Sequence, residues 1–211
     1  MEAHHLWCAF AGEKTYMSLV MPPQVIPPVM MPSTMVPPAA QVMTPRTRKP
    51  LCISISPAQE SDVEAIYQLT IGLAMFERKT MEQILVTREK IQELAFGPNK
   101  VFEAIIARNG AESIGMAVYF YAYAGSMGAP ILYGEDLFVL RQFRGRGVGT
   151  NLLQELARKA TERGCCRMQW SVFDWNKDAI NVYEKLGATI RRDLHQVRLD
   201  ASDFGSLLGR Q

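Results

Sequence analysis

Residues 142–150 read Gln142-Phe143-Arg144-Gly145-Arg146-Gly147-Val148-Gly149-Thr150. A strand-like run from Tyr133 to Leu140 precedes them, and an apolar-periodic helix pattern from Leu152 to Ala160 follows. A glycine-rich turn between a strand and a helix leaves backbone N–H groups unpaired at the positive end of the helix dipole. Glycines let phosphate oxygens approach these groups, and two arginines favour a pyrophosphate. The stretch therefore predicts an anion-binding turn.

Three kinds of phosphate-binding turn compete for this stretch. A Walker-type loop needs a lysine after its last glycine, and none follows Gly149. A dinucleotide fingerprint, G-x-G-x-x-G, places its third glycine one residue later than this chain does. The third pattern is Arg144-x-x-Gly147-x-Gly149, which resembles the pyrophosphate loop of the GNAT superfamily of N-acetyltransferases. The remaining alternative is a plain strand-to-helix turn closed by glycines.

A second motif follows in the order that the same superfamily shows. It reads Asn176-x-x-Ala179-x-x-x-Tyr183-x-Lys185-x-Gly187 and resembles the segment that lies beside the pantetheine arm of coenzyme A. Asn176 is predicted to cap a helix, and Gly187 suits the position after its end. Tyr183 could instead be an ordinary core aromatic on one face of that helix.

The resemblance narrows to the diamine acetyltransferase group, which includes spermidine/spermine and thialysine acetyltransferases. It covers roughly residues 53–199 and is carried by six segments: Leu73–Glu77, Glu93–Gly97, Tyr133–Val139, Phe143–Gly145, Val172–Asn176 and Tyr183–Ala188. It implies an α/β (α+β) GNAT fold with a mixed, mostly antiparallel sheet flanked by helices. It also implies a homodimer.

The residue pattern independently predicts one α/β domain over residues 51–211. Strands are expected at residues 52–56, 101–108, 114–123, 131–140, 167–173 and 190–199. Ser61-x-x-Glu64 reads as a capping box that opens the first helix, and Thr87 is expected to cap the second. Asn109-Gly110 predicts a turn between the second and third strands. In this predicted order, strands joined by hairpins come first and a crossover helix comes later, which indicates a partly antiparallel sheet.

Residues 1–50 differ in composition from the rest. They hold nine of the twelve prolines and seven of the twelve methionines. Proline at this density prevents helices and interior strands, so the segment is predicted to be a disordered arm. It could bind a partner, or it could be a consequence of how the start of the chain was defined.

Composition excludes several functions. The net charge of +2 is too small to favour nucleic acid or an anionic membrane, and no apolar run is long enough to span a bilayer. The four cysteines lack metal spacing and read as free thiols of a reducing compartment. We therefore expect a cytoplasmic protein without a metal, a nucleic-acid partner or a membrane anchor.

The resemblance implies acetyl-CoA as the co-substrate, bound largely through backbone groups. The residues it assigns to this role are Leu137, Phe138, Val139, Arg144, Gly145, Arg146, Gly147, Val148, Gly149, Thr150, Asn176, Lys177, Asp178 and Ala179.

Acetyl transfer to an amine needs a base for the amine proton and an acid for the departing thiolate. Glu135 and Asp136 are neighbours on one strand and are expected to face opposite sides. By resemblance, Glu135 is the base, acting through water, and Tyr183 is the acid. Glu135 could alternatively be an edge carboxylate, and Tyr183 could orient the sulfur rather than protonate it.

The acceptor is expected to be a primary amine in a groove that carries carboxylates. The assigned substrate residues are Phe76, Glu77, Glu135, Asp136, Gln169, Trp170 and Ser171. In the spermidine/spermine enzymes an acidic residue and a tryptophan begin the last strand, where this chain has His195 and Val197 preceded by Arg191-Arg192. These departures favour a shorter amine, such as thialysine, lysine or a diamine, over a long polycation. An arginine could bind an amino acid's carboxylate.

Three other functions remain open from sequence. The same fold could acetylate a protein or peptide, which would need a wider groove near residues 124–130. It could also bind coenzyme A without transferring acetyl groups. In a third interpretation the Met/Pro-rich arm is the functional part of an interaction protein.

Overall fold

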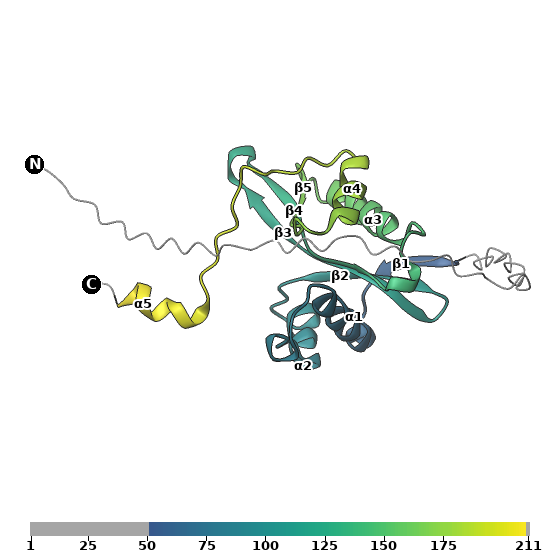
Figure 1. The fold of residues 1–211 in the computed structure, drawn as a ribbon, viewed down its shortest axis with the longest axis horizontal. Helices are drawn as coiled ribbons and strands as arrows, with labels where there is room; N and C mark the ends of the chain where they lie inside the picture. The colour runs from purple at the N-terminus through teal and green to yellow at the C-terminus, as the bar shows by residue number, and fades with distance from the viewer. Residues whose placement is uncertain (1–50, 210–211) are drawn as a thin grey trace, which may run out of the picture. The chain divides into compact units, whose positions relative to one another are not determined.

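The computed structural model describes residues 51–209, so the predicted arm over residues 1–50 lies outside the described part of the chain. From residue 53 to residue 185 the order of elements is that of the predicted α/β (α+β) fold (Figure 1). The strands are β1 (Ile53–Pro57), β2 (Glu103–Asn109), β3 (Glu112–Ala124), β4 (Ala129–Val139) and β5 (Met168–Trp170). The helices are α1 (Val63–Phe76), α2 (Arg88–Ile91), α3 (Val148–Glu162), α4 (Lys177–Lys185) and α5 (Phe204–Leu208).

The five strands form one sheet in the order β1-β2-β3-β4-β5. The first three pairings are antiparallel, and β4 pairs with β5 in parallel across the α3 crossover. The sheet is therefore mixed and mostly antiparallel, which confirms the predicted fold class.

Helices cover both faces of the sheet (Figure 1). On one face, Ile66 and Leu69 of α1 and Ile91 of α2 pack with Ile106 and Met116 of the sheet, among other buried residues. The opposite face packs against α3 through Val148, Leu152 and Leu156. Because side chains alternate along a strand, Ile105 and Ile106 are both fully buried in different layers.

Two of the predicted local signals are confirmed. The Thr87 hydroxyl accepts a hydrogen bond from the Lys90 N–H at 3.3 Å and caps α2, which continues as a wide turn over Gln92–Phe96. Gly110, in the predicted Asn109-Gly110 turn, has φ of 63° between β2 and β3.

The predicted capping box at Ser61 is wrong. Asp62 instead accepts a hydrogen bond from the Gln59 N–H at 2.8 Å, so the cap lies two residues earlier. Glu64 is unavailable for the predicted cap because its carboxylate binds Arg88 and Gln68.

The predicted strand over residues 190–199 does not form. Residues 191–209 are exposed, and Arg191 pairs locally with Asp193 while Arg198 pairs with Asp200, each at 2.7 Å. These charges interrupt the apolar face that a strand needs for burial. β5 is also shorter than the predicted strand over residues 167–173.

One glycine of β3 provides a stability test. A Cβ at Gly115 would lie 2.8 Å from the Phe138 carbonyl oxygen of β4. The neighbouring strand would have to move, so Gly115→Ala is expected to lower the free energy of unfolding by about 2 kcal/mol. Gly205→Ala is the control, since nothing lies within 4 Å of a Cβ there, and should change it by less than about 0.5 kcal/mol. Equal effects in urea denaturation would contradict the close approach of β3 and β4.

Candidate active site

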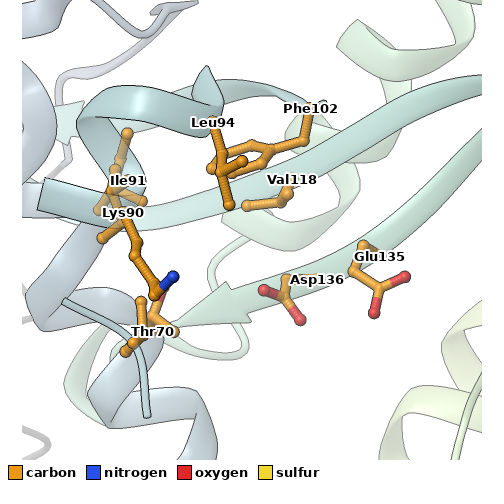
Figure 2. A pocket seen from close by; sticks show the side chains of 10 residues that line it. Thr70, Lys90, Ile91, Leu94, Phe102, Val118, Glu135 and Asp136 are labelled. Atoms are coloured by element: carbon orange, nitrogen blue, oxygen red, sulfur yellow. The ribbon is translucent and has the colours of Figure 1, made fainter. Parts of the chain in front are cut away.

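Strand β4 carries one extra residue relative to β3. Val118 pairs with Asp136, whereas the next residue, Tyr119, pairs with Gly134, so Glu135 has no partner in β3. A bulge of this kind breaks the alternation of side chains along a strand. Glu135 and Asp136 consequently line the same cavity, and the expectation that they face opposite sides is wrong (Figure 2).

The cavity has a volume of about 300 Å³ and lies between α1, α2 and the sheet. Most of its lining is apolar, with Glu135 and Asp136 on one side and Lys90 and Thr70 on another (Figure 2). The remaining lining residues are Ile66, Val86, Ile91, Leu94, Phe102 and Val118. Sequence reasoning assigned none of the α1 and α2 residues of this cavity to the site.

Asp136 is the carboxyl group whose environment most alters its chemistry. Its burial raises the pKa to about 6, and the charges of Glu135 and Glu77 add to this rise, while Lys79 opposes it. A carboxyl with a pKa near 6 is ionised at neutral pH and is a stronger base than an ordinary aspartate. The structure therefore brings three of the predicted substrate residues into one electrostatic cluster.

Beyond Gly134, strand β4 separates from β5. Their pairing covers Leu132–Gly134, while β4 continues to Val139. The Leu140 N–H donates to the Ile114 carbonyl of β3 at 2.9 Å, so the backbone groups of Val139 point the other way, toward the β5 side. Leu137 and Val139 therefore have no pairing partner in β5, and we call this part of the β4 edge the gap; its backbone groups suit an extended amide-containing chain.

Arg144 closes one end of this gap. Its Nε donates to the Val139 carbonyl oxygen at 2.8 Å, and its guanidinium lies 4.4 Å from the ring centroid of Phe76 and 5.4 Å from that of Phe138. Burial lowers the pKa of Arg144, as does the neighbouring charge of Arg141. The side chain braces the loop against β4, and its contact with a phosphate stays a prediction.

The loop before α3 has the geometry of an anion-binding turn. Gly145 and Gly147 have φ of 68° and 82°, and nothing lies within 4 Å of a Cβ at either position. The Asn151 N–H donates to the Gly147 carbonyl at 2.9 Å, so the earlier N–H groups of Val148, Gly149 and Thr150 precede the helical hydrogen-bond ladder. Arg146, beside them, is partly buried. The predicted turn therefore presents backbone donors and open space together.

Tyr183 lies buried on α4, 7% exposed, with its ring edge-on to Trp170 at 5.3 Å between centroids. Burial raises the pKa of its phenol, and the hydroxyl makes no hydrogen bond to the described residues. A Cβ at Gly134 would lie 3.6 Å from the Trp170 Cβ, which connects this pair to β4. Tyr183 is therefore a core aromatic whose hydroxyl remains available to a ligand.

The start of α4 agrees with its motif. The Asn176 Oδ1 accepts a hydrogen bond from the Ala179 N–H at 3.3 Å, as predicted for a cap. Lys177 and Asp178 are exposed in the first turn, and the Asp178 charge opposes the lowering of the pKa of Arg144. Gly187, after the helix, has φ of 86°.

An aromatic cluster that sequence reasoning missed joins α1 to the loop after β5. The ring of Trp175 lies 5.5 Å from Phe76 and 5.4 Å from Phe173, and Arg78 lies 5.2 Å from its centroid. Phe76 therefore packs between this loop and Arg144. The contact joins residues about a hundred positions apart, so periodicity carries no signal for it.

The other predicted substrate residues have local partners. Glu77 pairs with Lys79 at 2.8 Å, and Ser171 Oγ lies 3.1 Å from Tyr133 Oη. Gln169 is exposed. Arg191 and His195, considered for the substrate groove, lie in the exposed segment after α4.

Neither a metal centre nor a membrane span is found within residues 51–209. No group of three or more His, Cys, Asp or Glu side chains is placed to hold a metal ion there. Among the described helices, none has the length and apolar character needed to cross a bilayer.

Comparison with known proteins identifies the class to which this fold and site belong. Residues 65–188 match the Acetyltransferase (GNAT) family. The chain is an acetyltransferase and belongs to this family.

Several relatives are N-acetyltransferases. A thialysine N-epsilon-acetyltransferase of Mus musculus is 34% identical over 142 residues, covering 64% of this chain and 82% of that protein. The thialysine N-epsilon-acetyltransferase of Caenorhabditis elegans is 36% identical over 121 residues, covering 57% and 73%. An L-ornithine N5-acetyltransferase of Arabidopsis thaliana is 33% identical over 104 residues, covering 49% and 42%.

Solved structures share the fold at lower sequence identity. An integron cassette protein of V. cholerae superposes with a TM-score of 0.63 at 20% identity, covering 74% of this chain and 98% of that chain. An aminoglycoside acetyltransferase from an uncultured soil metagenomic sample superposes with a TM-score of 0.61 at 18% identity, covering 70% and 95%.

The raised pKa of Asp136 predicts an unusual stability change. The folded-state pKa lies above the value of 3.8 for an exposed aspartate, so folding disfavours the ionised form, and the penalty grows as pH rises from about 4 through about 6. Asp136→Asn should therefore raise the free energy of unfolding at pH 7 by about 2 kcal/mol, an effect that disappears near pH 4. The control is the exposed Glu112 of β3, which is not among the groups that act on Asp136, and Glu112→Gln should change stability by less than about 0.5 kcal/mol. A destabilised Asp136→Asn protein at pH 7 would mean that the carboxylate is held by stabilising partners.

Proposed function

We propose that this enzyme transfers the acetyl group of acetyl-CoA to the primary amine of a small diamine, polyamine or thialysine/lysine-like substrate. The observation that carries the proposal is the placement of Asp136, with its raised pKa, in a small apolar cavity beside the gap between β4 and β5. The gap, the glycine loop and the start of α4 supply the kinds of group that suit the pantetheine and pyrophosphate of the co-substrate.

The size of the cavity favours a small acceptor over a protein or peptide. Ligand cavities span roughly 300 to 1,000 Å³, and this one, at about 300 Å³, is at the small end. Thialysine and ornithine, after which relatives are named, each carry a terminal amine at one end of an unbranched chain and an α-ammonium with a carboxylate at the other. We infer the same substrate class for this chain.

In the proposed reaction each of these residues has a separate role. The cationic amine first gives one proton to a carboxylate of the β4 bulge, and the neutral nitrogen attacks the thioester carbonyl carbon. The carbon–sulfur bond then breaks, and the departing thiolate takes the proton of the Tyr183 hydroxyl. The second nitrogen proton restores the Tyr183 phenol, which yields the amide and free coenzyme A. Glu135 was the base predicted from sequence, whereas burial and charge favour Asp136. The other carboxylate then attracts the cationic amine to the site.

A panel of amines tests the transfer. Coenzyme A release should occur with thialysine, lysine or a diamine, and should fall at least tenfold in Tyr183→Phe and about a hundredfold in Asp136→Asn. The Glu135→Gln protein should lose less activity than Asp136→Asn. Binding of acetyl-CoA without transfer to any small amine, but with transfer to a lysine peptide, would favour the peptide acetyltransferase. Binding without any transfer would favour a coenzyme A-binding module.

The pH profile separates the role of Asp136 from the titration of the amine. At pH 5 most Asp136 is protonated and cannot accept a proton, so wild type should approach Asp136→Asn in activity. The ratio of the two kcat/KM values should therefore fall about tenfold between pH 7 and pH 5. The substrate's own protonation cancels in this ratio. A ratio that stays constant over this range would exclude a base with a pKa near 6.

A homodimer and a cytoplasmic location remain proposals from family resemblance and cysteine usage. Sedimentation of the full chain at several concentrations measures the first, and fractionation of cells measures the second. Loss of residues 1–50 should leave catalysis intact if the arm is not part of the enzyme.

A further inference from the structure

The cavity beside the β4 bulge has opposite charges at its two sides. Glu135 and Asp136 line one side, and in Figure 2 the Lys90 side chain extends toward Thr70, with Asp136 lying between Thr70 and Glu135 in that view. Leu94, Phe102 and Val118 add apolar walls to the same cavity. This arrangement matches a ligand that is cationic at one end, apolar in the middle and anionic at the other end.

Lys90 is the basic residue of α2 that is available to such a ligand. The neighbouring Arg88 is already engaged, because its Nη2 donates to Glu64 at 2.9 Å and its guanidinium lies 3.9 Å from the Tyr67 ring centroid. Lys90 makes no ion pair with another residue in the range 51–209. The Lys90 side chain is exposed at the edge of the cavity, where a charged head group could keep part of its hydration.

The size and polarity of the cavity limit the ligand further. A volume of about 300 Å³ matches a short chain, and the rest of a longer ligand would have to lie outside the cavity. A long polyamine would place a second ammonium against apolar walls or near Lys90, and both placements are unfavourable. A terminal-amine amino acid also has a second ammonium at its α-carbon, but its carboxylate lies beside that group, so this end carries no net charge and the carboxylate can face Lys90.

We propose that this cavity is the acceptor subsite for an amino acid with a terminal amine, and that Lys90 binds the substrate's carboxylate while Glu135 and Asp136 receive its amine. The inference rests on the proposed function and adds a specificity-determining residue on α2. The sequence left open that an arginine binds such a carboxylate, and Arg191, one of the two considered, pairs with Asp193 in the exposed segment after α4.

Binding of three matched probes tests the subsite without requiring catalysis. The probes are 5-aminopentanoate, 1,5-diaminopentane and pentylamine, which share a five-carbon chain and differ in the group at the far end. Calorimetry or NMR titration of the full chain gives each Kd. Wild type should bind 5-aminopentanoate more tightly than 1,5-diaminopentane.

In Lys90→Gln, the Kd for 5-aminopentanoate should rise about five- to tenfold, because one solvent-accessible ion pair is lost. The Kd for 1,5-diaminopentane should fall, because a like charge is removed, while that for pentylamine should change less than twofold. Lys90→Arg should restore most of the preference for 5-aminopentanoate, and Lys90→Glu should reverse it.

The control is Lys100→Gln, which removes an exposed lysine that pairs with Glu103 at 3.6 Å and does not line the cavity. It should leave all three Kd values unchanged. The inference is overturned if Lys90→Gln shifts the three probes equally, if it shifts none, or if wild type prefers the diamine.

Steady-state kinetics distinguish this inference from the proposed function. With thialysine as acceptor, Lys90→Gln should raise KM about five- to tenfold and leave kcat within about twofold. If the enzyme acetylates small amines but Lys90→Gln leaves the KM for thialysine unchanged, the proposed subsite is wrong and the proposed function stands. If Lys90→Gln changes the Kd values of the probes as expected but no amine is acetylated, the proposed function is wrong and the proposed subsite stands.

Discussion

The pairing of β4 is the constraint on which the rest of the site depends. This strand pairs with β3 along most of its length but with β5 over three residues, and it carries an unpaired residue at Glu135. The early end of the β5 pairing opens a gap with backbone groups on its edge. Because of the bulge, the side chains of two successive carboxylate residues line the same cavity. Both irregularities lie within five residues of one another, so a single strand carries the proposed donor site and the proposed acceptor site side by side.

Burial then makes this geometry chemically useful. The apolar residues of α1 and α2 keep water from Asp136, and the two neighbouring carboxylates oppose its ionisation further. Such an environment costs folding stability and is kept where a base is needed near neutral pH. Arg144 bonds to β4 and contacts Phe76, and Phe76 packs against Trp175, so these contacts connect the glycine turn and the loop after β5 to α1 and β4.

Local signals were the part of this molecule that sequence could predict. The glycine turn before α3, the Asn176 cap and the Thr87 cap depend on residues a few positions apart, and all three form as expected. The bulge at Glu135 depends on the register between two strands, so the alternating pattern predicted opposite faces wrongly. The strand over residues 190–199 was predicted from pattern alone and lacks an apolar face to bury. Lys90 belongs to none of the sequence motifs, and it lines the cavity only because α2 packs there.

The central claim is that the β4 bulge places Asp136 in a site that raises its pKa, and one measurement tests it directly. NMR titration of the free enzyme, with carbon-13 in the aspartate side chains and Asp136→Asn for assignment, follows the Asp136 carboxyl carbon with pH. We predict a midpoint near pH 6. A midpoint near pH 4, the value of an exposed aspartate, would contradict the account of the site.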